Sequence, residues 1–148
     1  MNINVKIKLL REGVSLPEYA TSGSAAVDLR SAADGDITLA PGERRLIPTG
    51  IAIAPETSGV VAILAARSGL SLKHGITTAN GIGVIDSDYR GEICVSLINT
   101  SGKPYTIAVG ERVAQLMFVP VFAADFILSD ELDETERGAG GFGSTGTK

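Results

Sequence analysis

Short runs in which polar and apolar residues alternate constrain the fold of this chain more than any other feature. Near the N-terminus, positions 3, 5, 7 and 9 are apolar and positions 2, 4, 6 and 8 are polar. The alternation returns at 51–53, 93–97 and 113–119. A period of two is typical of a β-strand with one buried face. Val60–Ala66 is a short continuous apolar run, which indicates a strand buried on both faces.

Turn signals separate these runs at short intervals. They are Asp34-Gly35, Pro41-Gly42, Ser101–Pro104 and Val109–Glu111. Many short strands joined by tight turns predict an antiparallel sandwich or barrel. The only helix that we expect is one or two turns long, around residues 68–74.

Composition limits the classes of function. A chain of 148 residues fits one domain, and 44% hydrophobic residues are enough to form a core. The net charge of −4 argues against binding of duplex DNA through a basic surface, but not against binding of a small nucleotide. Cys94 is the only cysteine and His74 the only histidine, so neither an internal disulfide nor a His/Cys zinc cage is expected. Any bound metal is expected to be a hard cation with oxygen ligands.

The chain has no apolar stretch that approaches the roughly 20 residues of a membrane span. Its first eleven residues alternate in polarity and lack the apolar core of a signal peptide. We therefore expect a cytoplasmic protein with neither a membrane nor a nucleic acid as a direct partner.

The segment Gly81–Gly91 reads GIGVIDSDYRG and has two interpretations. It is either an ordinary hairpin turn or part of a catalytic site. In the second interpretation, Asp86 follows the apolar stretch 83–85, where its carboxylate would be partly desolvated. Such a carboxylate can orient a water as a general base.

Two further segments carry charged residues next to apolar runs. Arg67 and Ser68 lie where the expected helix begins, which suits a phosphate. The alternative is that Ser68 is only an N-cap and Arg67 is solvated. Asp28 lies in a strand of small residues, where a single aspartate is usually a turn or edge residue.

The C-terminal residues 137–148 read RGAGGFGSTGTK. The segment contains a G-x-G-x-x-G pattern, but it lacks the flanking strand and helix of a dinucleotide-binding loop. It is either a disordered tail or a lid in which Arg137 binds phosphate, Phe142 stacks on a base and glycines let the backbone approach a ligand. We predict one domain over residues 1–136 and a flexible lid over 137–148.

Taken together, five segments resemble the motifs of the trimeric dUTPases (deoxyuridine 5'-triphosphate nucleotidohydrolases). In chain order they are Ser24–Leu29, Ala66–Leu70, Asn80–Gly91, Gly110–Gln115 and Arg137–Ser144. Each motif alone is weak, whereas the ordered set is specific and covers nearly the whole chain. The resemblance implies an all-β fold, a distorted jelly-roll β-barrel of the β-clip type with at most one short helix. It also implies a homotrimer whose active sites are shared between subunits.

The resemblance implies hydrolysis of dUTP to dUMP and pyrophosphate, which keeps uracil out of DNA and supplies dUMP for thymidylate synthesis. Asp86 would be the general base that activates a water for attack on the α-phosphorus. The implied cofactor is Mg²⁺, and Asp28 would hold the hydrated ion through water, from its outer shell.

The resemblance also assigns substrate contacts. Asn80 would bind the uracil edge, Tyr89 would pack under the deoxyribose, and Phe142 would stack on the base. The phosphates would receive hydrogen bonds from Arg67, Ser68, Gln115, Arg137 and Ser144. The remaining implied contacts are Gly69, Gly83 and Gly143.

Two other functions are compatible with this resemblance. A dCTP deaminase has a similar fold, but it typically carries a Pro-Gly-aromatic sequence and a catalytic glutamate where this chain reads DSDYRG. Release of ammonia from dCTP would identify it. A nucleotide-responsive protein-binding module would be favoured by loss of the general base or of the tail. In this chain both Asp86 and the tail are present.

Overall fold

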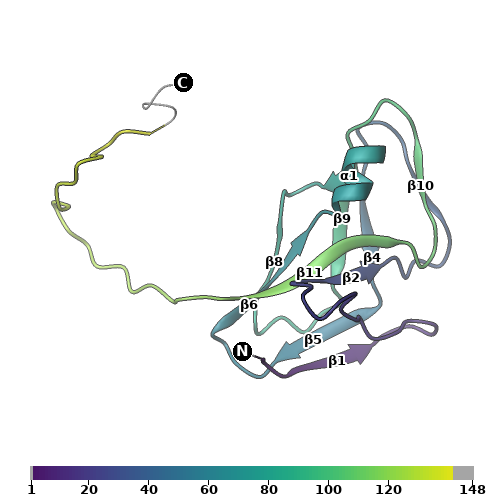
Figure 1. The fold of residues 1–148 in the computed structure, drawn as a ribbon, viewed down its shortest axis with the longest axis horizontal. Coiled ribbons are helices and arrows are strands. Elements are labelled where there is room, and N and C mark those ends of the chain that lie inside the picture. Colours follow the sequence, from purple (N-terminus) through teal and green to yellow (C-terminus); the bar gives the residue numbers. More distant parts are fainter. Residues whose placement is uncertain (1, 142–148) are drawn as a thin grey trace.

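The computed structural model describes residues 2–141, which form eleven strands and one short helix (Figure 1). The elements in chain order are β1 (Val5–Leu9), β2 (Val27–Arg30), β3 (Ile37–Leu39), β4 (Arg44–Pro48), β5 (Ile51–Pro55), β6 (Val60–Ala65), α1 (Ser68–His74), β7 (Ile76–Thr78), β8 (Gly83–Ile85), β9 (Cys94–Asn99), β10 (Tyr105–Ile107) and β11 (Arg112–Pro120). The predicted all-β class with one short helix is confirmed.

All strand pairs are antiparallel and form four small sheets, in the orders β2-β11-β6-β8, β4-β9-β7, β1-β5 and β10-β3. The arrangement is jelly-roll-like, as expected. Over residues 2–141 the strands do not close into the barrel that the resemblance implied, because the hydrogen-bonded ladders remain separate. The register of β11 against β2 shifts between Arg112 and Ala114, and such a bulge bends a strand.

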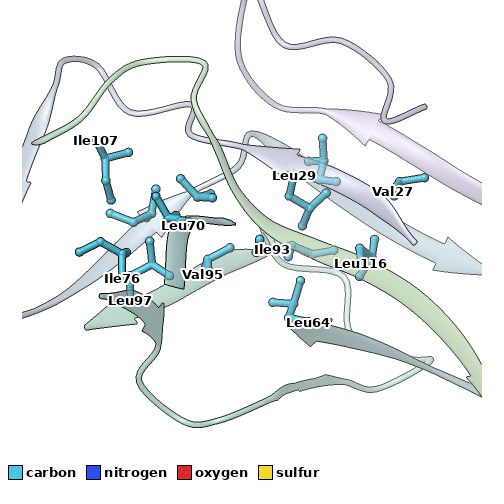
Figure 2. Packing of buried hydrophobic residues seen from close by; sticks show 14 of the residues in the cluster. Val27, Leu29, Leu64, Leu70, Ile76, Ile93, Val95, Leu97, Ile107 and Leu116 are labelled. Atoms are coloured by element: carbon cyan, nitrogen blue, oxygen red, sulfur yellow. The ribbon is translucent and has the colours of Figure 1, made fainter. Parts of the chain in front are cut away.

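One hydrophobic core fills the space between the sheets (Figure 2). Leu29, Leu64 and Leu116 come from the four-stranded sheet, and Val95 and Leu97 come from β9. Alternate residues of β9 are buried, as the period of two predicted. Full burial of a side chain of this size contributes about 1.5–3 kcal/mol, so the core is the main source of stability.

The helix α1 has the bounds that the sequence predicted. It ends at Gly75, whose φ of 67° is left-handed. A Cβ at this position would lie 2.9 Å from the backbone nitrogen of Ser101, so a glycine is required. The N-cap is Arg67, without a side-chain cap hydrogen bond. The interpretation of Ser68 as an N-cap is therefore wrong, because the helix starts one residue earlier in the chain than that interpretation required.

The strand β6 is not buried on both faces within the described chain. Its residues 60, 62 and 64 are buried, whereas 61, 63 and 65 are only half-buried. In the ladders, Ile63 lies opposite Val84 of β8 and Met117 of β11, and Val61 lies opposite Val119. We call these five residues the outer apolar face. No helix of the described residues is long and apolar enough to cross a membrane.

Residues 121–141 form a C-terminal arm that leaves the body of the protein after β11 (Figure 1). Its apolar side chains are exposed, with Phe122 at 100%, Phe126 at 97% and Leu128 at 97%. The packed body thus ends at Pro120. The predicted lid over 137–148 lies mostly outside the described residues, and that boundary stays a prediction.

Candidate active site

The first, second and fourth sequence motifs come together around β2, β11 and the end of β6 in the four-stranded sheet, and the third motif supplies the last strand of that sheet, β8. Gln115 of β11 lies opposite Asp28 of β2 on one side and opposite Ala65 of β6 on the other. The chain then passes from β6 directly to Arg67 and the start of α1. Sheet topology thus places Asp28, Arg67 and Gln115 in one region, although they are far apart in sequence.

Ion pairs fix the side chains of Asp28, Arg67 and Arg112 in this region. Together with Gln115 we call these residues the Asp28 cluster. Asp28 Oδ1 accepts a hydrogen bond from Arg67 Nε at 2.9 Å, and its Oδ2 accepts one from Arg112 Nη1 at 3.0 Å. Arg67 Nη1 also donates to the carbonyl oxygen of Arg112 at 3.1 Å. Two guanidinium groups share one carboxylate, so the cluster has a positive balance that suits an anionic ligand.

Arg112 was not among the predicted site residues. Its signal in the sequence is its place in the fourth motif, three residues before Gln115. Ser68 and Gly69 follow Arg67 directly, and both are exposed at the start of α1. The structure therefore brings together the predicted residues Asp28, Arg67, Ser68, Gly69 and Gln115.

The third motif covers the turn between β7 and β8, the strand β8 and the loop that follows it. Asn80 is exposed in this turn, and the hydroxyl of Thr78 donates to the carbonyl of Gly81, which has a φ of 74°. Gly83 lies opposite Leu64 of β6, where a Cβ would approach that of Leu64 to 3.0 Å. Glycine at 83 thus lets β8 pair closely with β6.

Asp86 follows β8 at the start of a tight loop. Tyr89 N donates to Asp86 O at 3.1 Å, and Arg90 Nη1 donates to the carbonyls of Ser87 and Tyr89 at 2.8 and 2.9 Å. Arg90, which the sequence analysis did not single out, thus closes the loop. Asp86 itself is exposed in the described chain, whereas we expected partial desolvation. Over residues 2–141, no hydrogen bond or ion pair joins the Asp86 side chain to the Asp28 cluster.

Tyr89 folds back over the end of the same loop. Its hydroxyl donates to the carbonyl of Glu92 at 3.2 Å. A Cβ on Gly91 would overlap this hydroxyl, so the glycine makes room for the ring. The tyrosine remains 45% exposed, which leaves part of its ring free to contact a ligand.

The described part of the fifth motif, residues 137–141, lies apart from the rest of the candidate site (Figure 1). Arg137 belongs to the C-terminal arm, where its Nε donates to Gly140 O at 2.8 Å. Phe142, Gly143 and Ser144 lie outside the described residues. The structure thus groups motifs one, two and four, and it leaves the Asp86 loop and the arm separate from them.

The described part of the chain contains no group of three or more acidic, histidine or cysteine side chains that could hold a metal by itself. Asp28 is a single carboxylate that two arginines already contact. Such a site fits an ion that brings water and phosphate oxygens as its own ligands, which is how Mg²⁺ is usually bound with nucleotides.

Comparison with known proteins identifies relatives along nearly the whole chain. A family model described as dUTPase matches residues 12–146. The deoxyuridine 5'-triphosphate nucleotidohydrolase of Desulfitobacterium hafniense (strain DSM 10664 / DCB-2) is 52% identical over 147 residues, covering 98% of this chain and 97% of the relative. The protein of the same name from Shewanella sp. (strain ANA-3) is 50% identical, with both chains covered completely.

Solved structures agree with these relatives. The dUTPase of Staphylococcus bacteriophage 80alpha with dUpNHpp matches with a TM-score of 0.89 at 28% identity, covering 97% of this chain and 99% of the phage chain. A mutant dUTPase of phage phi11, described as revealing the coordination of a structural Mg(II) ion, has a TM-score of 0.80 at 24% identity over 88% of this chain and 99% of the phage chain. The latter likeness bears on the fold alone.

Proposed function

The chain belongs to the dUTPase family, and we propose on this premise that it hydrolyses dUTP to dUMP and pyrophosphate. The observation that carries the proposal is that relatives named for this reaction share half of their residues with the chain over its full length. The sequence DSDYRG after β8 favours this reaction over deamination of dCTP. The activity would keep uracil out of DNA and supply dUMP.

In the proposed mechanism, Asp86 is the general base. Its carboxylate takes a proton from a water whose oxygen attacks the α-phosphorus. A new P–O bond forms while the bond between the α-phosphorus and the bridging oxygen breaks, and pyrophosphate leaves with the electron pair. The hydrogen bonds of the Asp86–Arg90 loop hold the backbone from which the carboxylate extends before substrate arrives.

The Asp28 cluster binds the triphosphate in this proposal. Arg67, Ser68 and Gln115 donate to the phosphate oxygens, and Arg137 and Ser144 add donors when the C-terminal lid closes. The 2.9 Å hydrogen bond that Arg67 Nε donates to Asp28 Oδ1 supports a fixed orientation of Arg67. Donors that are already oriented lose little entropy when they stabilise the developing negative charge.

Mg²⁺ is the proposed cofactor, and when bound it neutralises charge on the triphosphate oxygens. Asp28 would hold the hydrated ion through water from its outer shell. The two carboxylate oxygens of Asp28 accept hydrogen bonds from Arg67 and Arg112, and each still has a free lone pair for a water of the ion.

The third motif selects the nucleoside. Asn80 binds the uracil edge, the backbone near Gly83 completes the pocket, and Tyr89 packs under the deoxyribose. A cytosine would leave donors of such a pocket unpaired, and unpaired buried donors give strong discrimination. Phe142 and Gly143 would cover the base, and Gly69 would lie next to the phosphate donors.

We propose a homotrimer in which each active site combines residues of three chains. Two observations support association. The outer apolar face includes Val84, which is 57% exposed, and the apolar side chains of the arm are exposed among the residues that the structure describes. Exposed apolar surface of this kind marks an interaction site. Association would also place an Asp86 loop of one chain next to the Asp28 cluster of another.

Pyrophosphate release tests the proposal. The purified protein is assayed with dUTP, dTTP, dCTP and UTP, with and without Mg²⁺, and ammonia is measured with dCTP. Among the four nucleotides, we expect only dUTP to yield pyrophosphate, and we expect a much higher rate of release with Mg²⁺ than without it. Ammonia from dCTP, or equal turnover of all four nucleotides, would contradict the proposal. The expected cytoplasmic location stays a prediction, which cell fractionation can test.

A further inference from the structure

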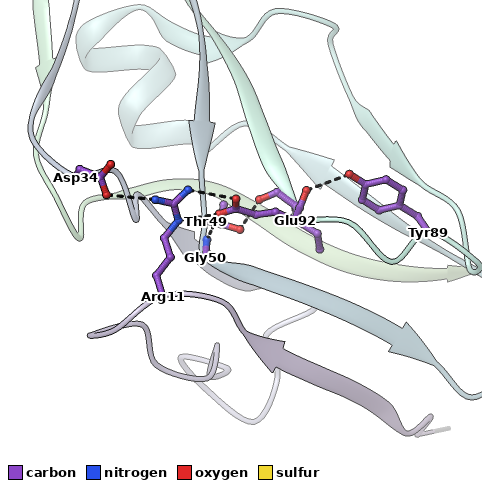
Figure 3. Close-up of polar contacts among 7 residues, drawn as sticks. Arg11, Asp34, Thr49, Gly50, Tyr89 and Glu92 are labelled. Carbon is purple, nitrogen blue, oxygen red and sulfur yellow. Dashed lines mark hydrogen bonds and ion pairs between the residues drawn. The ribbon is translucent and has the colours of Figure 1, made fainter.

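Arg11 and Glu92 form a two-pronged ion pair at the base of the loop that carries Asp86 and Tyr89 (Figure 3). Arg11 Nε donates to Glu92 Oε1 at 3.2 Å, and Arg11 Nη2 donates to Glu92 Oε2 at 3.3 Å. The two side chains are 34% and 24% exposed. A two-pronged pair fixes the direction of both groups as well as their distance.

Glu92 is held from a second direction by the turn between β4 and β5. Gly50 N donates to Glu92 Oε1 at 2.8 Å, and Ile93 N donates to Ile51 O at 2.8 Å. The hydroxyl of Thr49 donates to the carbonyl of Ile93. Residues 92 and 93 are thus tied to the body by both their backbone and the Glu92 side chain.

This network ends at Tyr89. Its hydroxyl donates to the carbonyl of Glu92, the residue that Arg11 and Gly50 hold. Figure 3 shows the resulting series of contacts from Asp34 through Arg11 and Glu92 to Tyr89. Because the ring is half exposed and anchored by its hydroxyl, its position depends on where the backbone of Glu92 lies.

We propose that Arg11 and Glu92 are positioning residues that set the place of the Tyr89 ring and so determine the discrimination between deoxyribose and ribose. The inference rests on the proposed function, in which Tyr89 packs under the sugar. Neither residue touches the substrate. To exclude a single 2′-hydroxyl, the ring must be placed to well within the length of one bond. A site whose supporting contacts are loose loses this accuracy.

A purely structural role for the pair would have a different signature. Loss of the pair would then lower the stability of the protein and affect all nucleotides alike. A positioning role changes the ratio of kcat/KM for dUTP to kcat/KM for UTP, and this ratio does not depend on the amount of folded enzyme. The ratio is therefore the quantity to measure.

The test uses the full chain with Arg11→Gln, Glu92→Gln and the double substitution. The amide oxygen of a glutamine at 92 can still accept the hydrogen bonds that Gly50 N and Arg11 Nε donate to Oε1, so the variant loses the second prong to Arg11 and the negative charge. We expect each single variant to lower the dUTP/UTP ratio by about tenfold to a hundredfold, with KM for dUTP changing more than kcat. The double variant should resemble the singles, since the two residues act as one unit.

Matched variants separate this effect from a loss of charge. Asp34→Asn removes the other partner of Arg11, which lies 3.3 Å away and is 99% exposed. Arg45→Gln breaks a surface pair with Glu43 elsewhere. Both should keep the wild-type ratio. Arg11→Lys keeps the positive charge but not the two-pronged contact, so it should give an intermediate ratio. It replaces Arg11→Gln in the test if that variant folds poorly.

Tyr89→Phe tests the last link in the series. It removes the hydroxyl that contacts Glu92, so it should lower the ratio in the wild-type background and have little further effect with Glu92→Gln. An unchanged ratio in Arg11→Gln, Arg11→Lys and Glu92→Gln, with a lowered melting temperature, would overturn the inference. If the wild type itself releases no pyrophosphate from dUTP, the proposed function fails instead, so the two failures are distinguishable.

Discussion

At the scale of single residues, Gly91 decides where the Tyr89 ring can lie. The ring folds back over this glycine so that its hydroxyl reaches the carbonyl of Glu92. Any side chain at 91 would take the space that the hydroxyl occupies. The constraint comes from a contact within the loop and not from backbone strain.

We predict that Gly91→Ala displaces Tyr89 and lowers kcat/KM for dUTP by about tenfold or more, because a misplaced contact near the substrate is costly. Gly102→Ala is the matched control, since a Cβ at 102 would meet nothing within 4 Å. Steady-state kinetics of the two variants provide the measurement. Equal kinetics for both would show that the Tyr89 ring is not constrained by position 91.

Asp86 is the residue on which the proposed chemistry depends. We predict that Asp86→Asn lowers kcat by about 10²–10⁴-fold while dUTP still binds, because an amide keeps the shape but cannot take the proton of a water. Single-turnover assays and calorimetry with the variant measure the two quantities separately. A variant that keeps nearly the wild-type kcat would remove Asp86 from the role of general base.

Glu92 also gives the stability a dependence on pH. Its pKa lies below the ordinary value of 4.5, chiefly because Arg11 donates a hydrogen bond to the carboxylate. Because the pKa is lower in the folded state than in the unfolded state, the ionised carboxylate stabilises the protein at pH values above the ordinary pKa. This contribution is lost as the pH falls through the folded-state pKa.

We therefore predict that wild type is more stable than Glu92→Gln at pH 7, and that the difference shrinks as the pH falls below the ordinary pKa. Midpoints of urea unfolding at a series of pH values measure the difference. In an Arg11→Gln background the shrinkage should be smaller, since the main cause of the lowered pKa is then missing. A difference that stays constant down to strongly acidic pH would contradict the assignment.

At the scale of elements, the sequence predicted where strands and the helix lie better than it predicted which faces of the strands are buried. Period-two alternation identified β1 and β9, and the bounds of α1 were predicted correctly. The continuous apolar run of β6 was misread as burial on both faces. Within the described chain only one face of β6 is fully buried. The sequence could not show this, because an apolar residue that packs on the core and an apolar residue on the outer face look alike in a sequence.

The candidate site was predictable only in part for a related reason. The resemblance named Asp28, Arg67 and Gln115, and the structure brings them together. It did not name Arg11 and Glu92, which are 81 positions apart and meet only through the folded topology. Local patterns contain no signal for an ion pair of this kind.

The outer apolar face yields a prediction for the assembly of strands β6, β8 and β11. Val84→Glu places a charge on this face at a side chain that is 57% exposed, so the protomer itself should tolerate it. In the proposed trimer the charge would be buried without a partner, which is strongly unfavourable. We expect light scattering to find a smaller species for this variant.

Leu72→Glu is the control for this substitution. Leu72 is 88% exposed on α1, away from the outer apolar face. This variant should keep the mass of the wild type. If Val84→Glu keeps that mass as well, the outer apolar face is not the contact between subunits.

At the scale of the whole molecule, a single chain holds the parts of the proposed site but does not bring them together. The Asp28 cluster, the Asp86 loop and Arg137 lie on different parts of the chain without hydrogen bonds between their side chains over the described residues. The C-terminal arm leaves the body with its apolar side chains exposed (Figure 1). A second and third copy of the chain can supply what each protomer lacks.

Complementation between two inactive chains tests this arrangement. The first chain carries Asp86→Asn, and the second is truncated before Arg137, so that one lacks the general base and the other lacks the lid. Each should be inactive when expressed alone. When equal amounts of the two chains assemble at random, about a quarter of all sites should combine an intact base from one chain with an intact lid from another, which is one site in each trimer that contains both chains.

Co-expression with two different affinity tags allows purification of trimers that contain both chains. We expect these mixed trimers to release pyrophosphate from dUTP at a substantial fraction of the wild-type rate, while trimers of either chain alone do not. The control for residual activity is a chain that carries both defects, expressed with each of the two tags and purified in the same way. If the base and the lid of one site came from the same chain, no mixture could restore an intact site, and the purified mixed trimers would remain inactive.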